Sequence, residues 1–126
     1  MKRFIALSFA GLMGLSLQVS ALCLSISESY SGIIEGETEL TVHGPFEITG
    51  DNGCSGASID AVVSPGGAGS APMISIERAS GGGWSPVASS IGNSVSYVGA
   101  FGTYRVRLNN PESNSKAYSG NVRYGR

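Results

Sequence analysis

After residue 21, apolar side chains recur at every second position in short runs, and turn-forming residues separate these runs. Tyr104, Val106 and Leu108 form the clearest run, with Arg105 and Arg107 at the alternate positions. Such alternation is typical of a strand that buries one face, whereas a surface helix repeats its apolar residues every three or four positions. No stretch past residue 22 keeps helical spacing for three turns. We therefore expect an all-β protein.

The runs are spaced so that about seven to nine short strands fill residues 22–126. The residues expected to face inward are Leu22, Leu24 and Ile26, in a strand ending near Tyr30-Ser31-Gly32; the even positions of 34–42; Phe46 and Ile48; Ile59, Ala61 and Val63; Ile74 and Ile76; Val95 and Tyr97; Tyr104, Val106 and Leu108; and Tyr118, Val122 and Tyr124. Many short strands at this spacing indicate one β-sandwich or jelly roll.

Turn-forming residues separate the expected strands. Asp51-Asn52-Gly53 and Ser80-Gly81-Gly82-Gly83 each supply residues that adopt positive φ at little cost. Gly44-Pro45 breaks the alternation between Val42 and Phe46. Pro86 interrupts the short run of residues 84–88, because proline cannot donate to a central ladder; this segment is expected at a sheet edge or in a loop.

Residues 1–21 have the organisation of a secretory signal peptide. Lys2 and Arg3 precede an apolar run from Phe4 to Val19, and Val19 and Ala21 lie three and one positions before the expected cut. Cleavage leaves residues 22–126 as a single domain. We expect this domain to be periplasmic, at the cell surface or extracellular.

A membrane anchor and a lipid anchor are the two alternatives to a signal peptide at the N-terminus. A membrane anchor is disfavoured because the apolar run is shorter than the roughly 20 residues of a spanning helix. Lipidation of Cys23 is disfavoured because bulky Leu22 lies where a small residue is normally required. The sequence therefore predicts no stable membrane anchor.

Cys23 and Cys54 are the two cysteines of the chain. An exported protein meets oxidising surroundings, so we expect them to form a disulfide. Closing this loop constrains the unfolded chain by about 3.7 kcal/mol in the chain-entropy model.

The sequence offers little catalytic chemistry. His43 is the single histidine, so a site with two histidine ligands is excluded within one chain. A Ser-His-Asp arrangement of His43 with Asp51 or Asp60 has no favoured serine, and no Gly-x-Ser-x-Gly elbow occurs. Glu39 and His43 are both odd-numbered residues of the same expected strand, which places both side chains on its solvent-exposed face. There we expect a solvated histidine rather than a metal ligand. The sequence predicts no cofactor, no metal and no enzyme.

Glu35, Glu37 and Glu39 occupy the odd positions of the expected strand 34–42. Two carboxylates of this kind could imitate a glycosidase pair, but a flat strand offers no pocket. We interpret the three as a solvated, acidic outer face.

Opposite charges are concentrated in opposite halves of the chain. Residues 22–76 contain seven acidic residues and no Lys or Arg, whereas residues 77–126 contain two acidic residues and six basic ones. These counts give residues 22–126 a net charge of −3, which disfavours nucleic acid as a partner. Either Glu35, Glu37 and Glu39 meet Arg105, Arg107 or Arg123 across a sheet, or the two halves form charged poles that associate head to tail.

Trp84 is a candidate contact residue. It follows three glycines and precedes Ser85-Pro86, which places it at a loop end. An exposed tryptophan stacks on a sugar or anchors a protein partner. The alternative, which we favour, is a ring folded back over the end of the sandwich.

Residues 73–124 resemble the second half of bacterial pre-peptidase C-terminal domains. The carriers are Met73-Ile74-Ser75-Ile76-Glu77, Gly102-Thr103-Tyr104-Arg105-Val106-Arg107-Leu108 and the final run from Tyr118 to Tyr124. The resemblance implies a small β-sandwich that accompanies secreted enzymes and helps them bind polymers or surfaces. The acidic turn cluster of a calcium site is missing here.

Together these features favour an exported, non-catalytic binding or structural module that acts through strand edges and loops. Its partner would be another protein or a surface polymer, self-association included, so a surface-assembly subunit and a polymer-binding accessory domain are both open. The alternative is a small periplasmic inhibitor or chaperone that caps a partner by β-augmentation, and a hydrolase of unknown type comes third. The candidate contact residues are Trp84, Glu35, Glu37, Glu39, Arg105 and Arg107.

Overall fold

The structure, a computed structural model, describes residues 22–90 and 92–126. The predicted signal peptide, residues 1–21, lies outside the described residues. No helix in these two ranges is long and apolar enough to cross a membrane.

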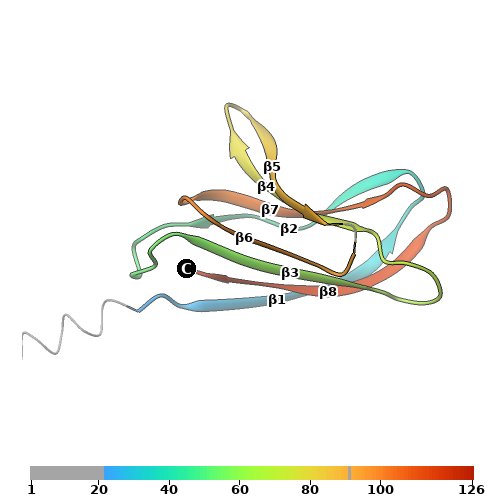
Figure 1. Cartoon of the computed structure of the whole chain (residues 1–126), viewed down its shortest axis with the longest axis horizontal. Helices are drawn as coiled ribbons and strands as arrows, with labels where there is room; N and C mark the ends of the chain where they lie inside the picture. The colour runs from blue at the N-terminus through green and yellow to red at the C-terminus, as the bar shows by residue number, and fades with distance from the viewer. Residues whose placement is uncertain (1–21, 91) are drawn as a thin grey trace, which may run out of the picture.

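Eight antiparallel strands form two four-stranded sheets (Figure 1). Their bounds are β1 Ser25–Ile34, β2 Thr38–Ile48, β3 Ala57–Pro65, β4 Met73–Ser80, β5 Gly83–Ser90, β6 Ser94–Gly99, β7 Gly102–Asn110 and β8 Lys116–Gly125. One sheet has the order β1-β8-β3-β6 and the other β2-β7-β4-β5. The strand pairs are therefore nested: β1 pairs with β8, β2 with β7, β3 with β6 and β4 with β5. This is the strand arrangement of a jelly roll. The expected β-sandwich is confirmed.

The core lies between the sheets and follows the predicted alternation in the central strands. Along β7, Tyr104, Val106 and Leu108 are fully buried, and along β3 every odd residue from Ala57 to Val63 is buried. Ile74 and Ile76 of β4 and Val122 of β8 complete the centre of this cluster. Since side chains of a strand alternate between faces, the intervening residues of these strands form the two outer faces of the sandwich.

The alternation misplaces the start and the end of β1. Leu22 and Leu24, expected to be buried, are 63% and 53% exposed, because they precede the strand and cover no part of the opposite sheet. Ile34, expected to open the next strand, is instead the buried last residue of β1. The chain then crosses to the other sheet through residues 35–37, where Glu37 has a φ of 56°. The predicted continuous strand 34–42 is therefore wrong.

Gly44-Pro45 interrupts the alternation without ending the strand. β2 runs through to Ile48, and its register against β7 shifts between Thr41 and His43 and again between His43 and Phe46. Gly44 has a φ of 119°, and a Cβ there would lie 2.8 Å from the Cβ of Arg105. A glycine is thus required where this β-bulge approaches β7.

The predicted turns and the predicted edge strand are confirmed. Gly53 has a φ of 92° and donates its N–H to the carbonyl of Gly50. Gly81 and Gly82, both with positive φ, join β4 to β5. The strand with Pro86 is the outermost of its sheet, and the β4–β5 hairpin rises away from the two layers (Figure 1).

The predicted disulfide is present. Cys23 and Cys54 are bonded, with their Cα atoms 4.6 Å apart. The bond joins the segment before β1 to the β2–β3 connection. Leu24 and Arg126 exchange two backbone hydrogen bonds next to it, of 3.1 and 2.7 Å. Both ends of the domain are therefore fastened at the same end of the sandwich.

Candidate binding surfaces

Four of the six candidate contact residues lie on one outer face. Because β7 buries its even residues, Arg105 and Arg107 project from the sheet β2-β7-β4-β5. The register places Glu77 of β4 opposite Arg105 and Thr41 of β2 opposite Arg107. Trp84 of β5 lies opposite Ala79 of β4. We call this surface the Trp84 face; its residues are Trp84, Glu77, Arg105, Arg107, Thr41 and Glu39.

The centre of the Trp84 face is a compact arrangement of Trp84, Arg105 and Glu77. The Cζ of Arg105 lies 4.2 Å from the centroid of the Trp84 ring, a cation–π contact. Arg105 Nε donates to Glu77 Oε1 at 2.8 Å, and Nη2 lies 2.7 Å from the same oxygen. The Arg105 and Glu77 side chains are only 20% and 16% exposed. Glu77 thus fixes the guanidinium that holds the indole.

Trp84 does not close the end of the sandwich. It lies in strand β5 and is half-buried, and it is not part of the core cluster. The favoured interpretation of a ring folded over the sandwich end was wrong, because the glycines before Trp84 form a hairpin and lead directly into the edge strand. The predicted loop end is the start of β5.

Arg107 and Glu39 form a looser pair on the same face. Arg107 Nη2 lies 3.6 Å from Glu39 Oε1, and Nη1 donates to Thr41 Oγ1 at 3.3 Å. Glu39 is 59% exposed, so this ion pair contributes only about 0–1 kcal/mol. The expected contact between an acidic and a basic strand is present between Glu39 and Arg107. The ion-pair partner of Arg105 is instead Glu77. Arg107 and Arg105, expected to be exposed, are both largely covered.

Glu35 and Glu37 do not belong to the Trp84 face. Both lie in the crossing between β1 and β2, which Asn110 organises. The buried Asn110 side chain donates to the carbonyls of Glu35 and Asn114 and accepts from the N–H of Glu112. The three predicted carboxylates therefore do not line one strand, because the strand ends at Ile34.

Arg123, the other expected partner of these carboxylates, lies on the opposite sheet. The register of β8 against β3 places it opposite Asp60. The acidic residues 35–39 and Arg123 are therefore not neighbours across a sheet.

The His43 side chain faces the interior of the sandwich rather than solvent. The bulge in β2 shifts the inward–outward alternation by one residue. His43 therefore lies opposite buried Val106. Its Nε2 is 3.3 Å from the hydroxyl of Tyr124, and its ring packs 5.1 Å from the ring of Phe46. Burial lowers the pKa of His43, while the charge of Glu28 opposes this effect. The prediction that His43 and Glu39 share a face was wrong.

We expect the free energy of unfolding to fall as the pH drops through about 6.5, the ordinary pKa of histidine. The sign follows because the folded pKa of His43 is lowered, so the unfolded chain takes up the proton first. His43→Gln removes the titrating group and is expected to flatten this part of the profile. Urea denaturation at pH values on both sides of 6.5 tests the effect. Identical profiles for the two proteins would contradict the assignment.

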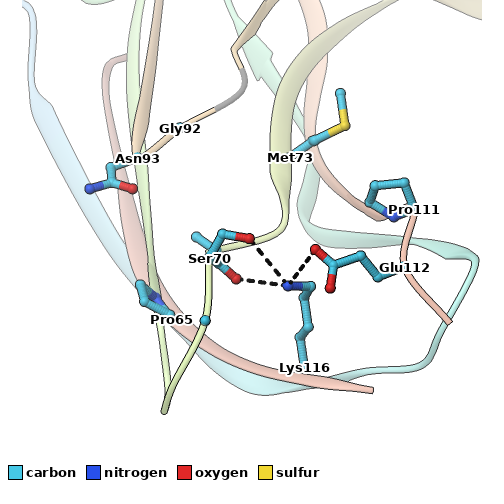
Figure 2. A pocket seen from close by; sticks show the side chains of 10 residues that line it. Pro65, Ser70, Met73, Gly92, Asn93, Pro111, Glu112 and Lys116 are labelled. Atoms are coloured by element: carbon cyan, nitrogen blue, oxygen red, sulfur yellow. Dashed lines mark hydrogen bonds and ion pairs between the residues drawn. The ribbon is translucent and has the colours of Figure 1, made fainter. Parts of the chain in front are cut away.

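A cavity of about 520 Å³ lies at the loop end of the sandwich (Figure 2). Pro65, Met73 and Pro111 are among its walls. The Lys116 ammonium lies 2.9 Å from the carbonyl of Ser70, 3.4 Å from its hydroxyl and 3.2 Å from Glu112 Oε2. Each of the three N–H donors of the ammonium group thus has an acceptor. Lys116 therefore links the β3–β4 connection to the β7–β8 connection and does not present a free charge.

This cavity was not foreseen from the sequence, because its walls come from three separate connections. The sequence signal was limited to their richness in Gly, Pro and Ser. Within residues 22–90 and 92–126, no three His, Cys, Asp or Glu side chains are grouped to hold a metal ion.

Comparison with known proteins gives a fold and no family. No protein-family model matches the chain, and no curated protein sequence matches it. The crystal structure of Yersinia pseudotuberculosis-derived mitogen is similar, with a TM-score of 0.61 and 19% identity over 79% of this chain and 86% of that chain. At this identity the similarity shows the fold alone.

Two further solved structures match with lower scores. A Bacillus endospore appendage, from a family of disulfide-linked pili, has a TM-score of 0.36 and 17% identity over 84% of this chain and 92% of that chain. PirA has a TM-score of 0.41 and 18% identity over 81% and 93%. Neither score supports an argument about function. The resemblance to pre-peptidase C-terminal domains stays a prediction.

Proposed function

We propose that residues 22–126 form an exported, non-catalytic binding module that contacts a protein partner through the Trp84 face. The observation that carries the proposal is the arrangement of Trp84, Arg105 and Glu77 on an open sheet face. The partner that we propose is a further copy of the same chain.

The chemistry of the Trp84 face suits a protein contact. Tryptophan and arginine are the residues that most often dominate the binding energy of protein interfaces. Here both side chains are already held in place, Trp84 by Arg105 and Arg105 by Glu77. Binding then loses less side-chain entropy than it would with free side chains.

The charges of the face suit contact with a second copy. Arg107 and Glu39 lie side by side in a loose pair, so a rotated copy can exchange partners with them. A surface that carries both signs is complementary to itself across a two-fold axis. Self-association is therefore assigned to the Trp84 face rather than to charged poles.

Other features support export and a non-catalytic role. The Cys23–Cys54 disulfide is typical of oxidising compartments. His43, the single histidine, has Tyr124 as its hydrogen-bonding neighbour between the sheets. It is therefore not arranged as the base for a serine on the surface.

The test is molecular mass by light scattering over a concentration series of the mature protein. We expect the wild type to form oligomers and Trp84→Ala to weaken association at least about tenfold, the effect of losing one hot-spot residue. Phe101→Ala is the matched control, since Phe101 is an aromatic residue that is 40% exposed and lies in the β6–β7 connection, with its ring beside Gly50. It is expected to associate like the wild type.

Two results would overturn the proposal. One is a wild type that stays monomeric at every concentration. The other is oligomers that persist in Trp84→Ala. The second result would favour β-augmentation, because β1 is a ten-residue edge strand without proline.

A further inference from the structure

The outer face of the other sheet, β1-β8-β3-β6, has an unusual composition. The first four outward positions of β1 are all serine: Ser25, Ser27, Ser29 and Ser31. Ser58 and Ser64 of β3, Ser94 and Ser96 of β6, and Ser119 of β8 also point outward. All nine serines are exposed. We call this surface the serine face.

The strand register aligns these side chains in rows. Ser29 lies opposite Asn121, which lies opposite Val62, which lies opposite Ser94. In the next row Ser31 faces Ser119, and Ser119 faces Ser64. Neighbouring strands are about 4.8 Å apart, and outward residues of one strand repeat about every 6.8 Å. The serine face therefore presents hydroxyl groups on a regular two-dimensional grid.

The serine face has almost no charge. Among the outward positions of its four strands, Asp60 and Arg123 are the charged residues, and they lie opposite each other. Ser96 Oγ also donates to Asp60 Oδ1 at 2.6 Å. Since the two charges compensate, the face has no net attraction for an ionic polymer. The ion pairs Arg105–Glu77 and Arg107–Glu39 are instead on the Trp84 face.

A hollow of about 490 Å³ opens within the grid. Its lining includes Ser29, Ser31, Ser64, Ser119 and Asn121, together with the partly exposed Val62. It lies at Gly120, where a Cβ would overlap the Val62 carbonyl oxygen. The absence of a side chain at Gly120 therefore lets the Val62 carbonyl and the Tyr30 ring lie against β8.

Tyr30 stabilises the strands around this hollow. Its hydroxyl donates to the Val62 carbonyl at 2.6 Å and lies 3.2 Å from the Asn121 carbonyl. Burial raises the pKa of Tyr30 to about 12, so the hydroxyl keeps its proton at neutral pH. The backbone acceptors at this point are thus occupied, and the hydroxyl and amide side chains remain for a ligand.

We propose that the serine face binds a neutral polysaccharide, with one sugar unit in the hollow. Serine hydroxyls both donate and accept hydrogen bonds, as sugar hydroxyls do. Val62 supplies an apolar patch for the C–H side of a sugar ring. A protein occupant of the hollow is disfavoured because serine and valine are under-represented among residues that dominate protein interfaces. An anionic polymer is disfavoured by the compensated charge.

The test is affinity electrophoresis of the mature protein in gels that contain a soluble polysaccharide. The neutral probes are hydroxyethylcellulose, laminarin, galactomannan and soluble starch, and alginate is the anionic probe. We expect at least one neutral probe to retard the wild type and alginate to leave it unaffected. The double variant Ser29→Ala/Ser119→Ala is expected to bind at least about tenfold more weakly.

Ser85→Ala/Ser89→Ala is the matched control, because these two exposed serines belong to β5 of the other sheet. It is expected to be retarded like the wild type. The melting temperature of each variant shows that the domain is folded. Retardation by none of the neutral probes, retardation that survives Ser29→Ala/Ser119→Ala, or retardation by alginate would each overturn the inference. None of these results bears on self-association through Trp84.

Discussion

Ile76→Asp is expected to unfold the domain, whereas Ser75→Asp, one residue earlier on the same strand, is expected to leave it folded. Ile76 is fully buried between the sheets, opposite Val106. An unpaired carboxyl group there costs at least about 4 kcal/mol, against a total stability of about 5–15 kcal/mol for a domain of ordinary size. Near-ultraviolet circular dichroism and proton NMR dispersion report the loss of packing.

Ser75→Asp is the control because it adds the same side chain to the outer face. Ser75 lies opposite Arg107, so the new carboxylate gains a neighbouring positive charge. We expect a change within about 0.5 kcal/mol, as for other surface substitutions. Equal destabilisation by the two variants would contradict the register of β4 against β7.

Removing the disulfide has the second large effect. Cys23→Ala/Cys54→Ala is expected to lower the free energy of unfolding by about 3.7 kcal/mol, because the unfolded chain regains the entropy of an open loop. Denaturation in urea measures this loss from the shift of the midpoint. Each single variant is expected to lose about as much as the double variant, since either one abolishes the bond.

Reduction of the wild type provides an independent check of the same bond. A reducing agent is expected to move the wild-type midpoint to that of the double variant and to leave the double variant unchanged. If the double variant unfolded at the wild-type midpoint, the bond would have no role in stability.

The sequence was most informative where a strand is central in its sheet. Tyr104, Val106 and Leu108 follow strict alternation because β7 has a partner on each side and one face on the core. The alternation failed where the chain changes sheets. Ile34 and Leu40 are both even-numbered, so the apolar alternation continues unbroken through residues 35–37. In the structure, however, β1 ends at Ile34 and β2 begins at Thr38. Periodicity cannot detect such a crossing, since it depends on Asn110 and the residues it contacts 75 positions away.

The candidate site was predicted in part. Trp84, Arg105, Arg107 and Glu39 were identified by residue type, and the strand order brings them to one face. Glu77 was missed as the partner of Arg105, because its proximity depends on the pairing of β4 with β7. His43 was misplaced because a bulge reverses parity within a strand. The serine face was visible as alternating serines in β1, but its rows depend on the register of all four strands.

The most direct test of the account is the fluorescence of Trp84 as the protein concentration rises. The chain contains one tryptophan, so the emission comes from the proposed contact and no substitution is needed. We predict that the emission shifts to shorter wavelength and that quenching by iodide weakens in the concentration range where the mass by light scattering increases. A mass that rises while emission and quenching stay constant, or a mass that never rises, would contradict the Trp84 face as the site of association.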